Sequence, residues 1–114
     1  MKMIIAVIKP SRLDAVLDAV TEAGATGLTV TEVRGYGRQK GKTEVYRGAE
    51  YEVKLLPKVR LEIAVMEEML EAVSNAIARS ASTGKIGDGK IFVIDLESAL
   101  RIRTGELDMA AISG

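Results

Sequence analysis

Cysteine, histidine and tryptophan are absent from this 114-residue chain, which has only two prolines, three tyrosines and one phenylalanine. Without cysteine or histidine the chain has no disulfide, no thiolate nucleophile, no Ser-His or Cys-His catalysis and none of the commonest zinc sites. With so few aromatic rings, a sheet surface that stacks nucleic-acid bases is not expected. Any catalysis would have to use carboxylates, lysines, hydroxyls or a borrowed metal.

Net charge is also lacking, because sixteen basic residues balance sixteen acidic ones. This balance argues against a general nucleic-acid binder. The charge is unevenly placed, however: positions 34–60 hold eight basic and three acidic residues. Such a basic segment favours an anionic ligand or partner surface, although a solvated charged loop is the alternative.

Long apolar runs are missing as well. The longest, Met3 to Ile8, is far shorter than a membrane span, and Lys2 leads into it without the regions of a signal peptide. We therefore expect a cytoplasmic protein. At this length the chain should form one domain, 1–114, with a single core.

Hydrophobic periodicity predicts two repeats of strand, helix and strand. Strands are expected at 3–8, 28–33, 59–65 and 91–94, with a brief edge strand at 100–103. Ser11 is expected to cap a first helix that ends near Gly24, and Met66 to Ile77 carry the apolar face of a second. The pattern predicts an α+β, ferredoxin-like split βαβ sandwich (βαββαβ), a four-stranded antiparallel sheet with two helices on one face.

Two features of this predicted fold point beyond the isolated chain. The segment from Gly37 to about Leu55, between the second and third strands, shows no period and is expected to be a long protruding loop. Its tyrosines suit partner docking or covalent modification, or else pack on the domain itself. The first strand is apolar on both faces, so the open face of the sheet should be covered by another subunit.

A glycine-rich stretch, Thr83 to Lys90, is the strongest chemical signal. Three glycines in six positions let backbone N–H groups turn toward an anion, and nearby Lys90, Arg101 and Arg103 supply positive charge. The spacing Gly84-x-x-x-x-Gly89-Lys90 resembles a phosphate loop of NTPases. Ile91 stands where that loop needs a hydroxyl, and a helix precedes the glycines where a strand should. The stretch therefore indicates a polyphosphate cradle that is not a P-loop, or else a plain connector.

Longer motifs carry a family resemblance: Thr29-Val30-Thr31-Glu32-Val33-Arg34-Gly35-Tyr36-Gly37-Arg38-Gln39-Lys40-Gly41, Tyr46-Arg47-Gly48-Ala49-Glu50-Tyr51, the glycine stretch, and Arg101-Ile102-Arg103-Thr104-Gly105-Glu106. In this order, over the whole chain, they resemble the PII nitrogen-regulatory signal proteins, the GlnB/GlnK group. The resemblance implies a homotrimer whose clefts between subunits bind ATP or ADP competitively. It also implies that 2-oxoglutarate enters with Mg-ATP.

The resemblance also assigns residues to each ligand. It places ATP or ADP at Thr29, Gly35, Arg38, Glu62, Ala64, Gly87, Asp88, Gly89, Lys90, Arg101 and Arg103. It places 2-oxoglutarate at Lys9, Gln39, Lys40, Gly41, Lys58 and Gly87. Gln39 would complete the magnesium shell, Tyr51 would be the residue modified by a nucleotidylyltransferase, and Arg47 would contact an ammonium transporter.

The implied mechanism is a switch, in which each ligand set selects a shape of loop 37–55 and each shape selects a partner. The partners would be the ammonium transporter and nitrogen-regulatory enzymes, with membrane contact only through the transporter. We expect a regulator and no enzyme. The alternatives are a weak ATPase using Glu62, Asp88 or Glu106, an adenine-nucleotide sensor without a 2-oxoglutarate response, and an RNA-binding module on the same fold.

Overall fold

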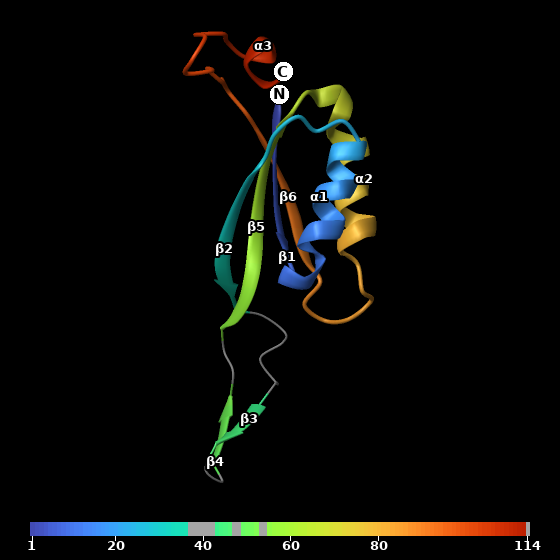
Figure 1. The fold of residues 1–114 in the computed structure, drawn as a ribbon, viewed down its shortest axis with the longest axis vertical. Coiled ribbons are helices and arrows are strands. Elements are labelled where there is room, and N and C mark those ends of the chain that lie inside the picture. Colours follow the sequence, from blue (N-terminus) through green and yellow to red (C-terminus); the bar gives the residue numbers. More distant parts are fainter. Residues whose placement is uncertain (37–42, 47–48, 53–54, 114) are drawn as a thin grey trace.

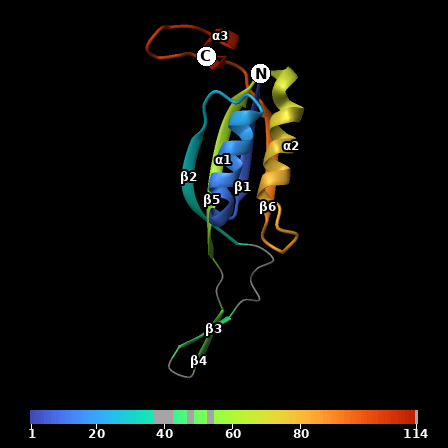
Figure 2. The ribbon, with the colours of Figure 1, turned by 45° about the vertical axis from the view of Figure 1, so that its right-hand side comes forward.

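The computed structural model describes residues 1–36, 43–46, 49–52 and 55–113, the two short segments as backbone only. A four-stranded sheet has the order β2-β5-β1-β6, with every neighbouring pair antiparallel. The strands are β1 (Lys2–Ile8), β2 (Thr29–Gly35), β5 (Leu56–Val65) and β6 (Gly89–Asp95). Helices α1 (Leu13–Glu22) and α2 (Leu70–Ala81) lie side by side on one face (Figures 1 and 2). The predicted βαββαβ fold is confirmed.

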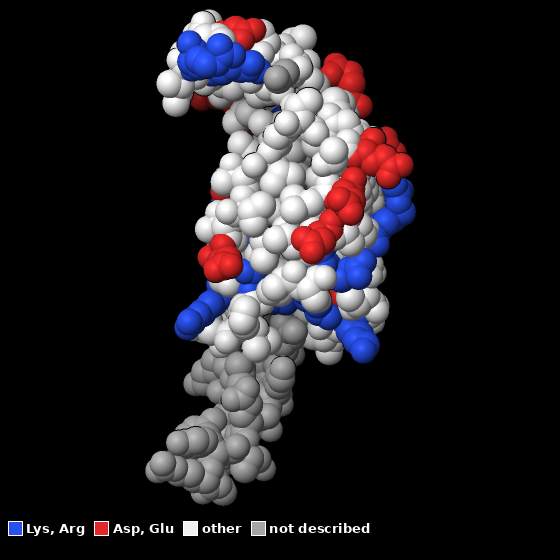
Figure 3. Space-filling model, in the orientation of Figure 1, with Lys and Arg blue, Asp and Glu red and all other residues white. Residues whose placement is uncertain are grey.

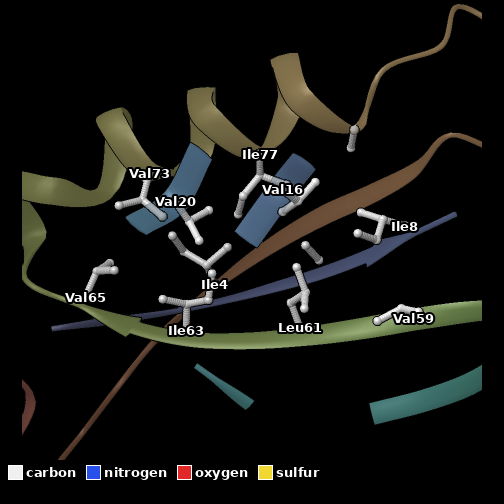
Figure 4. Close-up of a cluster of buried hydrophobic side chains, with 12 residues drawn as sticks. Ile4, Ile8, Val16, Val20, Val59, Leu61, Ile63, Val65, Val73 and Ile77 are labelled. Carbon is white, nitrogen blue, oxygen red and sulfur yellow. The ribbon is translucent and has the colours of Figure 1, made fainter. Parts of the chain in front are cut away.

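The core lies between the two helices and the sheet (Figure 4). In β5 the predicted alternation holds, because Val59, Leu61, Ile63 and Val65 are all buried toward the helices. From the helices, Val16, Val20, Val73 and Ile77 are fully buried against them. Each fully buried aliphatic side chain of this kind contributes roughly 1.5–3 kcal/mol through the area it removes from water.

Strand β1 is the central strand that its sequence predicts. Ile4, Ala6 and Ile8 are buried beneath the helices, while the alternate residues face the open side of the sheet and are half-buried. The neighbouring edge strand β6 leaves Phe92 and Ile94 half exposed on that open side, opposite β1 residues Ile5 and Met3. Within the described residues, the open face therefore carries uncovered apolar side chains over β1 and β6.

Two local predictions were wrong. The first concerns Ser11, because a 3-10 turn at Pro10–Arg12 precedes α1 and neither it nor the helix has a side-chain cap. Instead, Arg12 donates from Nε and Nη2 to the Ser80 carbonyl oxygen, at 2.9 and 2.7 Å. This contact ties the start of α1 to the end of α2 and satisfies a carbonyl in the last turn of α2.

The second concerns the C-terminal segment, where positions 100–103 form no edge strand. Leu100 makes one isolated bridge to Leu107, and the chain reverses between them through Gly105 at φ +74°. The Gly105 amide donates to the Arg101 carbonyl at 2.7 Å, which closes the reversal. The alternation of side chains at 100–103 therefore belongs to a tight turn and not to a strand. The turn leads into the short helix α3 (Met109–Ile112).

The long loop predicted from Gly37 to about Leu55 is confirmed between β2 and β5, although the sequence predicted no regular structure within it. Two short antiparallel strands lie within it, β3 (Thr43–Tyr46) and β4 (Ala49–Glu52). They form a separate two-stranded sheet that stands beyond the ends of β2 and β5 (Figure 1).

In the described parts of the chain, none of the helices has both the length and the apolar character needed to cross a membrane.

Candidate functional site

The predicted ligand residues gather in two grooves rather than one. The first, called here the loop groove, has a volume of about 580 Å³ and lies at the end of the sheet where β2 and β5 lead into residues 37–54. It contains the predicted residues Gly35, Lys58, Gly87, Asp88, Gly89 and Lys90. Basic side chains gather at this end of the molecule, while acidic ones follow the helical side (Figure 3). The loop groove is therefore electrostatically suited to an anion.

Gly89 brings the glycine loop close to the sheet. Its φ is +104°, and a Cβ built there would overlap the carbonyl oxygen of Val7 and lie 2.8 Å from its carbonyl carbon. Only glycine fits this approach, in which Gly89 pairs with Ile8 as the first residue of β6. Lys90 follows at once and pairs with Val7, so the strand register fixes a cation at the groove.

Asp88 closes the loop with its carboxylate. Oδ2 accepts hydrogen bonds from the backbone amides of Thr83, at 2.8 Å, and Gly84, at 2.9 Å. Oδ1 accepts the Thr83 hydroxyl and lies 3.2 Å from the Lys9 ammonium. The hydrogen bonds from the Thr83 hydroxyl and amide hold the pKa of Asp88 well below its usual range, so this carboxylate is a poor proton acceptor.

Lys58 is the buried cation of the loop groove, with 9% of its surface exposed. Its ammonium donates to the Gly87 carbonyl oxygen at 2.6 Å. Burial lowers the pKa of Lys58, the charge of nearby Lys9 lowers it further, and Asp88 opposes both. A carboxylate ligand beside Lys58 would offset these two costs of keeping its charge.

The second groove, called here the C-terminal groove, lies at the other end of the same sheet. Its volume is about 390 Å³, and it contains the predicted residues Thr29, Glu62, Ala64 and Arg101. The Arg101 guanidinium donates to the carbonyl oxygen of Ala111 at 3.1 Å and lies 3.6 Å from the Glu106 carboxylate. The hydroxyl of Thr26 donates to the Ile112 carbonyl oxygen at 3.0 Å. Helix α3 thus forms a wall of this groove.

The two grooves do not merge within one chain. Lys90 pairs with Val7 at one end of β1, and Asp95 pairs with Lys2 at the other. At about 3.3 Å per residue these ends are roughly 17 Å apart, and Arg101 lies farther along the chain. Lys90 and Arg101, both expected at phosphates, are therefore separated by the length of the sheet.

Among the remaining predicted residues, Lys9 and Arg103 lie in the described part of the chain and line neither groove. Lys9 contacts Thr83 and Asp88, and Arg103 is exposed in the turn before Gly105. Tyr51 lies in β4, which is described as backbone only. Arg38, Gln39, Lys40, Gly41 and Arg47 lie outside the described residues.

Sequence reasoning missed several residues that shape the grooves. Tyr36 and Phe92 line the loop groove, and Thr26 and Ile112 the C-terminal groove. The position of Tyr36 beside Gly35 was a local signal, and the alternation of β6 could have placed Phe92 on the same face as Lys90. For Thr26 and Ile112, which are far apart in sequence, no such local signal exists.

Comparison with known proteins gives one consistent answer. The family model described as "Nitrogen regulatory protein P-II" matches residues 1–106. The chain is 59% identical over 112 residues to "Nitrogen regulatory protein P-II" of Rhizobium etli, covering 98% of this chain and 100% of the relative. It is 60% identical, with the same coverage, to "Nitrogen regulatory protein P-II" of Klebsiella oxytoca and "Nitrogen regulatory protein P-II 1" of Escherichia coli strain K12.

This similarity is of full length and agrees with the fold, the glycine loop and the order of motifs. It also agrees with the expectation of a regulator in nitrogen metabolism rather than an enzyme. The chain belongs to the nitrogen regulatory protein P-II family of signal-transduction proteins.

Proposed function

We propose that this protein is a cytoplasmic, single-domain sensor of ATP, ADP and 2-oxoglutarate whose nucleotide site is completed between subunits of a homotrimer. The observation that carries the proposal is the separation of the expected phosphate ligands. Lys90 lies in the loop groove and Arg101 in the C-terminal groove, at opposite ends of one sheet. If the loop groove of one subunit faces the C-terminal groove of the next, both cations reach a single polyphosphate.

The open face of the sheet supports assembly. Phe92 and Ile94 leave about half of their surface exposed there, which is costly for a monomer in water. On the same face, Arg60 has a buried Nε with no acceptor among the described residues, and Glu62 is 3.6 Å away, too far for a hydrogen bond. A second copy could cover the apolar side chains and supply an acceptor.

The loop groove supports the sensing of a dicarboxylate. Nucleotide phosphates would lie along Gly87, Gly89 and Lys90, with Arg38 beside them, and 2-oxoglutarate would pair with Lys58 close to Gln39, Lys40 and Gly41. Magnesium, held by phosphate oxygens and Gln39, would neutralise part of this negative charge. Because Gln39 is at the base of the loop 37–55, its engagement would change the shape that the loop presents to partners.

The partners proposed are an ammonium transporter, contacted through Arg47, and enzymes or regulators of nitrogen assimilation. Tyr51 would be the residue that a nucleotidylyltransferase modifies. We do not favour the weak ATPase, because one of its candidate bases, Asp88, has a strongly lowered pKa and four donors around its carboxylate.

Calorimetric titration tests the proposal. The purified protein is titrated with ATP and magnesium, with and without 2-oxoglutarate, and with ADP for comparison. The proposal requires 2-oxoglutarate to bind only when Mg-ATP is present. Binding of nucleotide without any 2-oxoglutarate response would instead identify an adenine-nucleotide sensor and remove the roles given to Gln39 and Lys58.

Variants test the assignments. Lys90→Ala should weaken nucleotide binding while the assembly, measured by sedimentation, stays intact. Arg79→Ala is the control, because Arg79 is an exposed cation on α2. Gln39→Ala should mainly abolish the 2-oxoglutarate response. Sedimentation of the wild-type chain as a monomer at working concentration would contradict the shared site.

A further inference from the structure

The carboxylate of Asp88 has its acceptor capacity filled from within the protein. It receives the Thr83 and Gly84 amides, the Thr83 hydroxyl and the Lys9 ammonium. A carboxylate offers about four lone-pair positions, so four donors leave none for a magnesium ion or a ligand proton. This side chain is positioned to act on the loop and not on the ligand.

The same contacts decide which loop amides are free. The amides of Thr83 and Gly84 go to Asp88, and the Lys85 amide donates to the Thr83 hydroxyl oxygen at 3.3 Å. The next three amides, of residues 86–88, make no hydrogen bond to any part of the chain that the structure describes. Gly87 between them has φ +95°, the conformation that turns successive N–H groups into a concave anion site.

The Lys9 ammonium balances the negative charge of the Asp88 carboxylate. Lys9 lies 3.2 Å from Asp88 and donates to the Thr83 hydroxyl oxygen at 3.1 Å. Without Lys9, an uncompensated carboxylate next to the loop would repel phosphate, and without Asp88, two ammonium groups, Lys9 and Lys58, would face each other. Asp88 with Lys9 and Lys58 therefore leaves a net positive charge near the groove.

We infer that Asp88, Thr83 and Lys9 form an internal positioning cluster that fixes the loop 83–89 in its phosphate-binding shape before any ligand arrives. This inference rests on the proposed nucleotide site. The cluster acts through the backbone amides of residues 86–88 and makes no contact of its own with the nucleotide. Its effect should therefore grow with the number of phosphates and vanish for a ligand that has none.

The test compares adenosine, ADP and ATP by calorimetric titration of Thr83→Val, Thr83→Ser and Asp88→Asn. Valine keeps the shape of threonine without the hydroxyl, while serine keeps the hydroxyl. Thr21→Val is the matched control, because the Thr21 hydroxyl donates only within helix α1, to the Leu17 carbonyl oxygen. Urea midpoints confirm that each variant is folded.

We expect Thr83→Val and Asp88→Asn to bind ATP about tenfold more weakly, the loss corresponding to about one charge-assisted hydrogen bond. Adenosine affinity should stay within about twofold of wild type, and Thr83→Ser and Thr21→Val should bind ATP as the wild type does. Unchanged ATP affinity in Thr83→Val, or equal losses for ATP and adenosine, would overturn the inference while the proposed site stands. A wild-type protein that binds no nucleotide would refute the proposed function, and this inference with it.

Discussion

Gly89→Ala should destabilise this protein far more than the same substitution at Gly84. Both glycines have positive φ, +104° and +77°, so an alanine at either position strains the backbone. Their surroundings differ, because a Cβ on Gly84 would meet nothing within 4 Å, whereas one on Gly89 would overlap the Val7 carbonyl group. Comparing the two variants therefore separates the cost of backbone strain from the cost of steric overlap.

The loss of unfolding free energy expected for each substitution follows from these contacts. Strain alone costs about 1 kcal/mol at Gly84, where φ is near the left-handed region. At Gly89 the strain is about 1–3 kcal/mol. The steric overlap adds to it, because a carbon–oxygen contact needs about 3.3 Å and strands β1 and β6 must separate by roughly 1.5 Å. That separation breaks one or two ladder hydrogen bonds at about 1 kcal/mol each, for a total of about 2–5 kcal/mol.

Urea unfolding followed by far-ultraviolet circular dichroism measures the difference. All proteins are compared at one concentration, because assembly makes stability depend on concentration. With a slope of about 1.5 kcal/mol per M, the midpoint should fall by about 1–3 M for Gly89→Ala and by less than about 1 M for Gly84→Ala. Equal midpoints for the two variants would refute the close approach of Gly89 to β1.

Three further predictions concern stability. Ile77→Ala should cost about 2–5 kcal/mol and Ile77→Val about 0.5–1.5 kcal/mol in urea unfolding, because this side chain is fully buried; equal costs would contradict its burial. Arg12→Ala should cost about 1.5–3 kcal/mol through its lost contacts with Ser80, with partial recovery in Arg12→Lys, whose ammonium cannot donate as a fork. An unchanged midpoint would show that the contact is not formed. Because the pKa of folded Asp88 is lowered, its stabilising effect is complete above the ordinary value of 3.8 and is lost as the pH falls toward the folded value. Asp88→Asn should therefore be less stable than wild type at neutral pH, and the difference in free energy of unfolding should shrink as the pH is lowered. A difference that does not change with pH would show that the pKa of folded Asp88 is not lowered.

Elements whose pattern is local and repeated were predictable from the sequence. The strands with period two and the helices with apolar residues three and four apart both follow from which side chains must avoid water. Val59, Leu61, Ile63 and Val65 are buried as predicted, and β6 includes the predicted strand 91–94 within the longer range Gly89–Asp95. The glycine stretch indicated an anion cradle because only glycine permits such backbone turns.

Predictions failed where a specific hydrogen bond, and not the apolar pattern, decided the structure. Ser11 has the chemistry of a helix cap, but Arg12 reaches the Ser80 carbonyl oxygen and the chain enters α1 through a 3-10 turn. Positions 100–103 alternate like a strand, but Gly105 and its hydrogen bond to Arg101 reverse the chain there. The first contact is with a residue far along the chain, and the second is a local turn that an alternation of apolar residues does not reveal.

By itself, the sequence determined the order of strands and helices, the buried face of each, and the family, because local periodicity and long motifs are written in consecutive residues. Tertiary structure alone decided how the predicted ligand residues are distributed. Strand register places Lys90 at one end of the sheet, and β6 brings the chain to the other end, where Arg101 follows. It also turned Asp88 and Lys9 toward Thr83, since a charged side chain binds the nearest partners that folding brings within a few ångströms.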